Sequence, residues 1–188
     1  MNAKKAVSAC LTVVLSLGTA RYALAQPNNP APPDTMARAQ ERMVRQVRHE
    51  LVMLPQFGVF DNLAYKVDGD TVTLMGQVRN AVLKDEARDA VKHIEGVEHV
   101  NNQIEILPVS FNDDRIRRQA ARAIFHDSTL SMYSIQPVPP IHIIVKNGHL
   151  TLEGVVRNQM DKDVAGIRAN GVSGVFSVDN NLQVERGK

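Results

Sequence analysis

The sequence contains the stretch VDGDTVTLMGQVRNAVLKDEARDAVKHIEGVEHVNNQIEI (Val67–Ile106) and, further along, a second version of it, VKNGHLTLEGVVRNQMDKDVAGIRANGVSGVFSVDNNLQV (Val145–Val184). The two stretches align without a gap at an offset of 78 positions, from residue 67 to residue 145. Chance similarity rarely keeps one register over such a length. A repeat with this period therefore indicates two copies of one folding unit.

The segments that precede the two stretches also match. Arg42-Met43 and Gln46 align with Arg115-Ile116 and Gln119 at an offset of 73 positions. The change of offset from 73 to 78 places an insertion in the second copy, around Ser131 to Pro140.

Each copy is expected to begin with an amphipathic helix, because apolar residues recur every three or four positions. These residues are Met43, Val47, Leu51 and Leu54 in the first copy, and Ile116, Ala120, Ala123 and Ile124 in the second. Strict alternation of apolar residues then predicts two strands joined by a hairpin, with the turn at Asp68-Gly69 in the first copy and at Asn147-Gly148 in the second. The turn dipeptide differs by one position between the copies, so the exact register stays open.

A second helix and a last strand complete each copy. Asn80 and Asn158 are favourable N-cap residues, and Gly96 and Gly174 mark the end of the helical segment. The predicted fold class is α+β, with two tandem α-β-β-α-β modules. Each module is expected to be a three-stranded mixed sheet with both helices on one face, because this arrangement buries every apolar stripe. Modules of this size have small cores, so we expect the two to pack together.

The N-terminal residues have the features of a secretory signal, with Lys4 and Lys5 before the apolar run Val7–Leu17 and a cleavage site at Ala23-Leu24-Ala25. The run is too short for a membrane span, which needs roughly 20 apolar residues. The predicted organisation is a signal peptide, a proline-rich linker and two modules, over residues 1–25, 26–37, 38–109 and 110–188. The protein is therefore expected in the periplasm, with membrane association left open.

Removal of residues 1–25 changes the composition. The single cysteine is lost, which excludes disulfides and thiol catalysis in the mature chain. Of 22 Lys and Arg residues three are removed, and 19 remain against 20 Asp and Glu. The mature chain is close to neutral, whereas nucleic-acid-binding domains usually carry a clear positive excess. We therefore expect no nucleic-acid partner.

The order of elements and several short motifs resemble tandem BON domains. The motifs are Leu74-x-Gly76-x-Val78 before a capped helix and Gly96-Val97 with Val100-x-Asn102, and both recur in the second copy. The resemblance implies a periplasmic or envelope protein associated with osmotic stress, phospholipid contact, chaperone-like action or outer-membrane integrity, and it brings no catalytic residues. This sequence departs from the pattern through the insertion and through a weak helix in the second copy, where Gly166, Asn170 and Gly171 lower helix propensity.

Two rows of arginine are candidate contact residues. Arg38, Arg42 and Arg45 share one face of the first helix, opposite its apolar stripe, and Arg115, Arg118 and Arg122 share the corresponding face in the second copy. Guanidinium groups bind phosphate in a bidentate manner, so either row suits the headgroups of anionic lipids. The alternative is that each row is simply a solvated helix face.

The insertion supplies a second candidate. Met132, Tyr133 and Ile135 lie just before the prolines at 137, 139 and 140, in a backbone that does not readily join a strand. The loop is expected either to contact a lipid interface or partner, or to fold back over its own module or into the interface between the modules.

Six residues have structural rather than functional interpretations. Gly76 and Gly154 are expected to make room for a helix backbone or for a local bend, and Asn102 and Asn180 to form buried hydrogen bonds. Asn80 and Asn158 are the N-caps named above.

An enzyme is not expected. The only group of histidines and a carboxylate whose spacing suggests a metal site is His142, His149 and Glu153, and strand alternation places His142 on the outer face. The sequence contains no catalytic or nucleotide-binding motif. No cofactor, metal or small-molecule substrate is therefore predicted.

Two functions fit these observations. The first is a non-enzymatic envelope protein that contacts anionic phospholipid and supports envelope integrity or stress tolerance. The alternative is a soluble periplasmic chaperone or a scaffold for envelope proteins.

Overall fold

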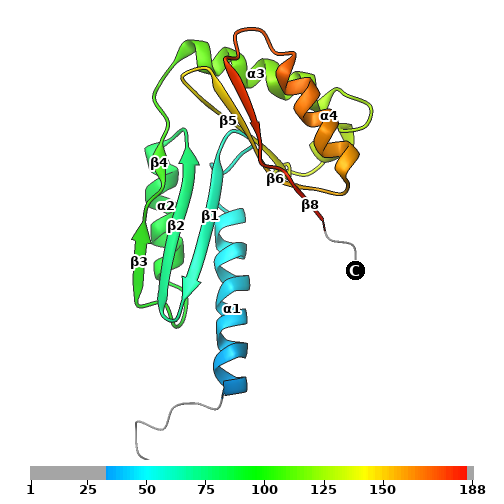
Figure 1. Cartoon of the computed structure of the whole chain (residues 1–188). Helices are drawn as coiled ribbons and strands as arrows, with labels where there is room; N and C mark the ends of the chain where they lie inside the picture. Colours follow the sequence, from blue (N-terminus) through cyan, green and yellow to red (C-terminus); the bar gives the residue numbers. More distant parts are fainter. Residues whose placement is uncertain (1–32, 186–188) are drawn as a thin grey trace, which may run out of the picture. The chain divides into compact units, whose positions relative to one another are not determined.

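The computed structural model describes residues 33–185 (Figure 1). Module 1 consists of α1 (Pro33–Val52), β1 (Asn62–Asp68), β2 (Thr71–Val78), α2 (Ala81–Lys92), β3 (His99–Asn102) and β4 (Glu105–Ile106). Module 2 consists of α3 (Phe111–Phe125), the 3-10 helix η1 (Ser131–Ser134), β5 (Ile141–Lys146), β6 (His149–Val156), α4 (Gln159–Asn170), β7 (Ser177–Asn180) and β8 (Gln183–Val184). The predicted element order and the α+β class are confirmed.

Each sheet is mixed, as predicted. β1 pairs antiparallel with β2, and β2 pairs in parallel with β3 and β4. Module 2 repeats this arrangement with β5, β6, β7 and β8. The strand predicted to be continuous at the end of each module is interrupted, which gives four strands to a sheet where three were expected.

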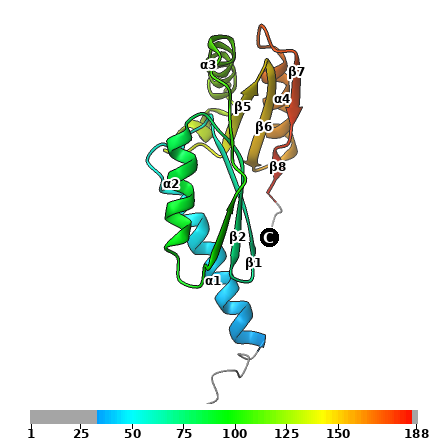
Figure 2. The same cartoon turned by 90° about the vertical axis from the view of Figure 1, so that its left-hand side faces the viewer.

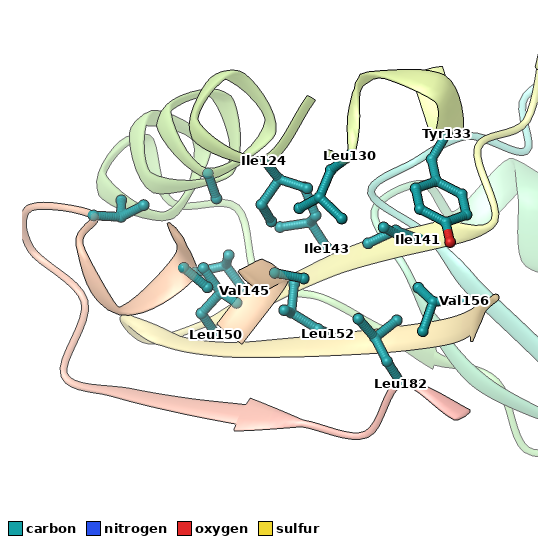
Figure 3. Packing of buried hydrophobic residues seen from close by; sticks show 14 of the residues in the cluster. Ile124, Leu130, Tyr133, Ile141, Ile143, Val145, Leu150, Leu152, Val156 and Leu182 are labelled. Atoms are coloured by element: carbon teal, nitrogen blue, oxygen red, sulfur yellow. The ribbon is translucent and has the colours of Figure 1, made fainter. Parts of the chain in front are cut away.

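The helices bury their apolar stripes against one face of each sheet. Figure 2 shows α1 and α2 on the same side of the sheet of module 1. In module 1 the core joins Val47 and Leu51 of α1 to Leu83 and Val91 of α2 over Leu74 of β2. Figure 3 shows the core of module 2, which also contains the fully buried side chains of Ile124, Leu130, Ile143 and Leu152. Full burial of such a side chain stabilises the fold by about 1.5–3 kcal/mol.

The hairpin turns occupy equivalent positions in the two modules. The turn of module 2 is Asn147-Gly148, as predicted, and both residues have positive φ, 53° and 80°. In module 1 Asp68 pairs with Thr71, so the turn is Gly69-Asp70 and the predicted Asp68-Gly69 was wrong by one residue. A two-residue loop of this kind requires residues that tolerate positive φ, which glycine and asparagine do.

Two predicted boundaries also move. α2 ends at Lys92 and α4 at Asn170, so Gly96 and Gly174 lie in the turn beyond the helix, both with φ of 89°. α1 begins at Pro33, inside the segment predicted as a linker. The signal-peptide prediction falls outside the described residues.

The modules contact each other directly. The chain from Pro33 onward forms one compact unit, in which Ile143 N–H donates to Val59 O at 2.7 Å. Val59 and Phe60 pack against the core of module 2. Lys146 and Glu105 form an ion pair between the modules. Among the described residues, no helix combines the length and hydrophobicity that a membrane span requires.

Candidate functional site

The outer face of α3 carries a continuous stripe of exposed side chains. They are Phe111, Arg115, Arg118 and Arg122, spaced by four, three and four residues, so that the helical repeat places them on one line. All four are exposed, and Phe111 is 92% exposed. The opposite face buries Ile116, Ala120 and Ile124. Within residues 33–185 no other element covers the stripe, which therefore faces solvent; only its polar groups form contacts.

A buried carboxylate fixes the start of this stripe. Ser110 caps α3 by accepting a hydrogen bond from Asp113 N–H. The Asp113 side chain is only 1% exposed and accepts hydrogen bonds from the main-chain N–H groups of Asn147 and Gly148, each at 2.9 Å. The N-terminus of α3 is thus held against the hairpin turn of module 2.

A second exposed aromatic ring lies at the same turn. Phe176 is 78% exposed and contacts Gly148, where an added Cβ would come within 2.5 Å of the phenyl ring. The guanidinium of Arg115 lies near Gly174, since a Cβ added to that glycine would be 3.3 Å from Arg115 Nη2. The same nitrogen donates to Asn112 Oδ1 at 2.7 Å. Arg115 thus lies beside the segment that carries Phe176, and Phe111 precedes Arg115 by about one helical turn on the exposed face of α3; we call these three residues the aromatic and basic corner of module 2. Sequence reasoning identified the arginines and missed both phenylalanines.

Module 1 has the arginine row without the aromatic corner. Arg38, Arg42 and Arg45 are exposed on α1, as expected for that helix face. At the offsets of the repeat, Arg38 occupies the position of Phe111, and Glu98 that of Phe176. Arg45 also lies 3.7 Å from Glu41, an exposed pair that contributes little energy but lowers the local positive charge. The two modules thus present different surfaces at equivalent places.

The insertion does not present Tyr133 to solvent. Tyr133 is 6% exposed and belongs to the core of module 2, as Figure 3 shows. Its hydroxyl donates to Asp161 Oδ2 and accepts from Arg157 N–H at 2.9 Å. Burial raises the pKa of this hydroxyl. Tyr133 is therefore not a contact residue, and the insertion folds back over its own module.

The neighbours of Tyr133 in the insertion remain accessible. Ile135 is 81% exposed, and Met132 is partly exposed with its Sδ 2.6 Å from Arg157 Nη2. They do not lie on the α3 stripe.

The asparagines have structural contacts. Asn102 Nδ2 donates to Lys84 O, and its Oδ1 accepts from Ile104 N–H. Asn180 makes the same pair of bonds with Lys162 O and Leu182 N–H. Each amide therefore ties the interruption in the last strand to the preceding helix. Asn80 and Asn158 cap α2 and α4 by accepting from Val82 N–H and Asp161 N–H, respectively.

Gly76 and Gly154 make room for a neighbouring strand and not for a helix. A Cβ at Gly76 would lie 2.1 Å from Asn62 O, and one at Gly154 would lie 2.0 Å from Pro140 O. Both residues also have φ in the positive range, 111° and 119°. The expected approach of a helix backbone was wrong, and the contact is with the start of the antiparallel partner.

The histidines of module 2 are held by other groups. His142 pairs in register with Glu153, but its ring stacks on Phe57 of module 1, so the outer sheet face predicted for it is covered. His149 Nδ1 lies 2.7 Å from Ser177 Oγ. Among residues 33–185, no three histidine or acidic side chains are grouped as metal ligands.

Comparisons with known proteins identify the family. The model of the BON domain matches residues 41–108 and again residues 112–186. BON domains are envelope modules associated with phospholipid binding. A comparison with curated proteins found no match.

Two solved structures of a Chlamydia trachomatis protein, CdsD of the type III secretion system, are similar to part of this chain. The structure of the CdsD C-terminal domain is 12% identical in sequence to this chain. The match covers 77% of this chain and 98% of the CdsD chain, with a TM-score of 0.27. A second structure of CdsD is 11% identical over 78% of this chain and 94% of that one, with a TM-score of 0.28. At these scores the likeness supports no further conclusion. The two matches to the family model cover most of the sequence, and the chain therefore belongs to the BON-domain family.

Proposed function

We propose that this chain is a non-enzymatic protein of the cell envelope that binds anionic phospholipid through the outer face of α3. The observation that carries the proposal is the exposed stripe Phe111–Arg115–Arg118–Arg122, together with Phe176 at its aromatic end. Guanidinium groups match the geometry of phosphate oxygens. The association of BON domains with phospholipid supports the same class of ligand.

The charges of the stripe predict weak binding that salt reduces. Each basic residue near an anionic surface contributes about 1 kcal/mol and is screened within a Debye length. Arg115, Arg118 and Arg122 together therefore give affinity for a charged surface but no tight binding to a single headgroup. Vesicles that present many headgroups are the appropriate probe.

The two phenylalanines add a contribution that salt does not screen. Burial of an exposed phenylalanine is worth roughly 1.5–3 kcal/mol, and aromatic rings are enriched at membrane interfaces. Phe111 and Phe176 are both exposed at one corner of module 2. Module 1 has no aromatic residue at either equivalent position, so module 2 is the lipid-contacting copy in this proposal.

The cellular role follows from this binding and from the signal sequence. A chain exported to the periplasm meets the anionic headgroups of the envelope there, and its contact with them supports envelope integrity or stress tolerance. No cofactor, metal or small-molecule substrate takes part.

Flotation of the purified chain from Gln26 onward with liposomes tests the proposal. Anionic and zwitterionic vesicles are compared at low and high salt for the native protein, for an Arg115→Gln/Arg118→Gln/Arg122→Gln variant and for a Phe111→Ser/Phe176→Ser variant. The matched control is Arg38→Gln/Arg42→Gln/Arg45→Gln, which removes the same charge from module 1.

We expect flotation with anionic vesicles only. The arginine variant of module 2 should lose the part of vesicle binding that high salt reduces. The phenylalanine variant should lose the part of vesicle binding that persists at high salt, and the control should float like the native protein. Equal losses in the two arginine variants would show that net charge, not the α3 stripe, is responsible.

Absence of flotation under every condition would favour the chaperone or scaffold function. The observation in its favour is an apolar surface on α4, where Met160 and Ile167 are 65% and 68% exposed and share one face of the helix. At the equivalent positions α2 has Val82 and Asp89. Suppression of aggregation of an unfolding client, lost on Met160→Ser/Ile167→Ser, would support that function.

A further inference from the structure

A small cavity lies beside the end of β2 and the beginning of α3. Its volume is about 140 Å³, and it is lined by Arg79, Leu107, Pro108, Val109, Asp114 and Arg117. A cavity measured in this way holds a water molecule once it reaches roughly 10–15 Å³. The space therefore accommodates several waters or one phosphate or carboxylate group.

Arg117 is a buried cation with an unused donor. The residue is 3% exposed, and its guanidinium donates through Nη1 to Asp114 Oδ1 at 2.6 Å and through Nη2 to Val145 O. Its Nε is buried and has no hydrogen-bond partner within residues 33–185. A buried donor left unpaired costs about 1–3 kcal/mol, and more when it is charged. An acceptor in the adjoining cavity would remove this cost.

Arg79 supplies a second guanidinium, which lies over the ring of Phe60. Its Cζ lies 5.1 Å from the centre of the Phe60 ring, and its main-chain N–H donates to the buried carboxylate of Asp61 at 2.8 Å. In the part of the chain that the structure describes, this guanidinium forms no ion pair and no hydrogen bond. All its donors are available to a ligand.

The charges around the cavity do not balance. Two guanidinium groups face one carboxylate, that of Asp114, which leaves one positive charge beside a partly enclosed space. Arginine forks bind carboxylate and phosphate oxygens through paired hydrogen bonds. We infer that this cavity is a binding site for a small oxyanion, a phosphate or carboxylate group held between Arg79 and Arg117.

The site is separate from the proposed lipid-contact stripe. Arg117 lies on the buried side of α3, whereas Arg115, Arg118 and Arg122 are exposed on its outer face. It is also not a repeated feature of the fold, because the position equivalent to Arg117 in module 1 is Val44. Arg79 belongs to module 1 and Arg117 to module 2, so an anion bound by both stabilises the contact between the modules.

Isothermal titration with inorganic phosphate and with acetate, at constant ionic strength set by chloride, tests the inference. We expect saturable binding in the millimolar range or tighter, weakened by at least about tenfold in Arg79→Gln. Asp114→Asn removes the competing carboxylate and is expected to bind more tightly than the native protein. Arg88→Gln, which removes an exposed charge from α2, outside both proposed sites, is the matched control and binds like the native protein.

A soluble short-chain phosphatidylglycerol, used below its micelle concentration, distinguishes the sources of the phosphate group. Tighter binding of this lipid than of inorganic phosphate, lost in Arg79→Gln, identifies a headgroup; binding of the free ions alone identifies a soluble anion. Flotation of Arg79→Gln, compared with the native protein, separates this site from the α3 stripe. The inference is overturned if neither anion nor lipid binds saturably, or if Arg88→Gln weakens binding as much as Arg79→Gln.

Discussion

The imidazole of His142 in module 2 stacks on the phenyl ring of Phe57 in module 1, with the ring centres 5.2 Å apart and the planes inclined by 22°. The next residue, Ile143, donates its main-chain N–H to Val59 O. β5 is an edge strand of its sheet, and exposed edges tend to pair with other chains. The segment 57–61 thus covers part of an edge that would otherwise be open.

This contact predicts a dependence of stability on pH. Burial lowers the pKa of His142, while the charges of Asp61 and Glu153 oppose the shift. Because the folded pKa is depressed, the unfolded chain binds more protons, and the stability that neutral His142 contributes is lost as pH falls through its ordinary value of 6.5. Unfolding by urea should therefore show a decrease in free energy from pH 7.5 to pH 5 that is smaller in His142→Gln.

The control for this prediction is His126→Gln, since His126 is exposed at the C-cap of α3. It should retain the native pH dependence. A nuclear magnetic resonance titration reads the same property directly, and a His142 pKa at or above its ordinary value of 6.5 would contradict the prediction.

Gly76→Ala and Gly154→Ala should each destabilise the protein severely. The added Cβ would lie about 2 Å from a carbonyl oxygen of the adjacent backbone, at a φ that L-residues rarely adopt. Backbone strain of this kind costs on the order of 1–3 kcal/mol before the clash is counted. The measurement is the urea midpoint, with Gly171→Ala as control, because a Cβ there has no neighbour closer than 3.5 Å. A loss in Gly76→Ala no larger than in the control would show that the sheet opens easily at this point.

The internal repeat made the fold predictable, because two sequences had to satisfy one pattern. Helical and alternating periodicity gave the element order. Asn102 and Asn180 were predicted to form buried hydrogen bonds, and they form such bonds at half-buried positions. Periodicity could not predict which side chains other parts of the chain would bury. The sequence left open whether the insertion that carries Tyr133 is exposed or folds back; in the structure the Tyr133 ring lies in the core and its hydroxyl donates to Asp161.

Of the candidate site on α3, only the arginine side chains could be predicted from the sequence. Arginines at helical spacing indicate a face from sequence alone, whereas Phe111 and Phe176 are 65 positions apart in the sequence and belong to segments that are joined only at the turn that Asp113 holds. The oxyanion cavity likewise depends on the contact between the modules. Helical spacing separates Arg117 from its exposed neighbour Arg118, but the unpaired Nε of Arg117 and the cavity beside it depend on what packs against α3.

Tyr133→Phe should cost about 1–3 kcal/mol of unfolding free energy, because it removes the hydroxyl that pairs the buried Asp161 and the main-chain N–H of Arg157. Tyr65→Phe is the matched control. Its hydroxyl donates to Val44 O at an exposed position, where water replaces the lost partner. Chemical denaturation of both variants checks the prediction, which fails if the two losses are equal.

Asp113→Asn tests whether the hairpin turn and the start of α3 are held together by one carboxylate. The native side chain accepts from Asn147 N–H through Oδ2 and from Gly148 N–H through Oδ1, and an amide keeps only one of these acceptors. We expect a loss of about 1–3 kcal/mol and faster hydrogen exchange of the two turn amides than in the native protein. Asp163→Asn, at an exposed position on α4, should change neither property. Because Phe176 contacts this turn and Phe111 begins the helix that Asp113 ties to it, flotation of Asp113→Asn with anionic vesicles should also weaken at high salt, where the aromatic contribution dominates. Unchanged exchange of both turn amides would show that the type of turn alone, with positive φ at Asn147 and Gly148, is enough to fix the hairpin.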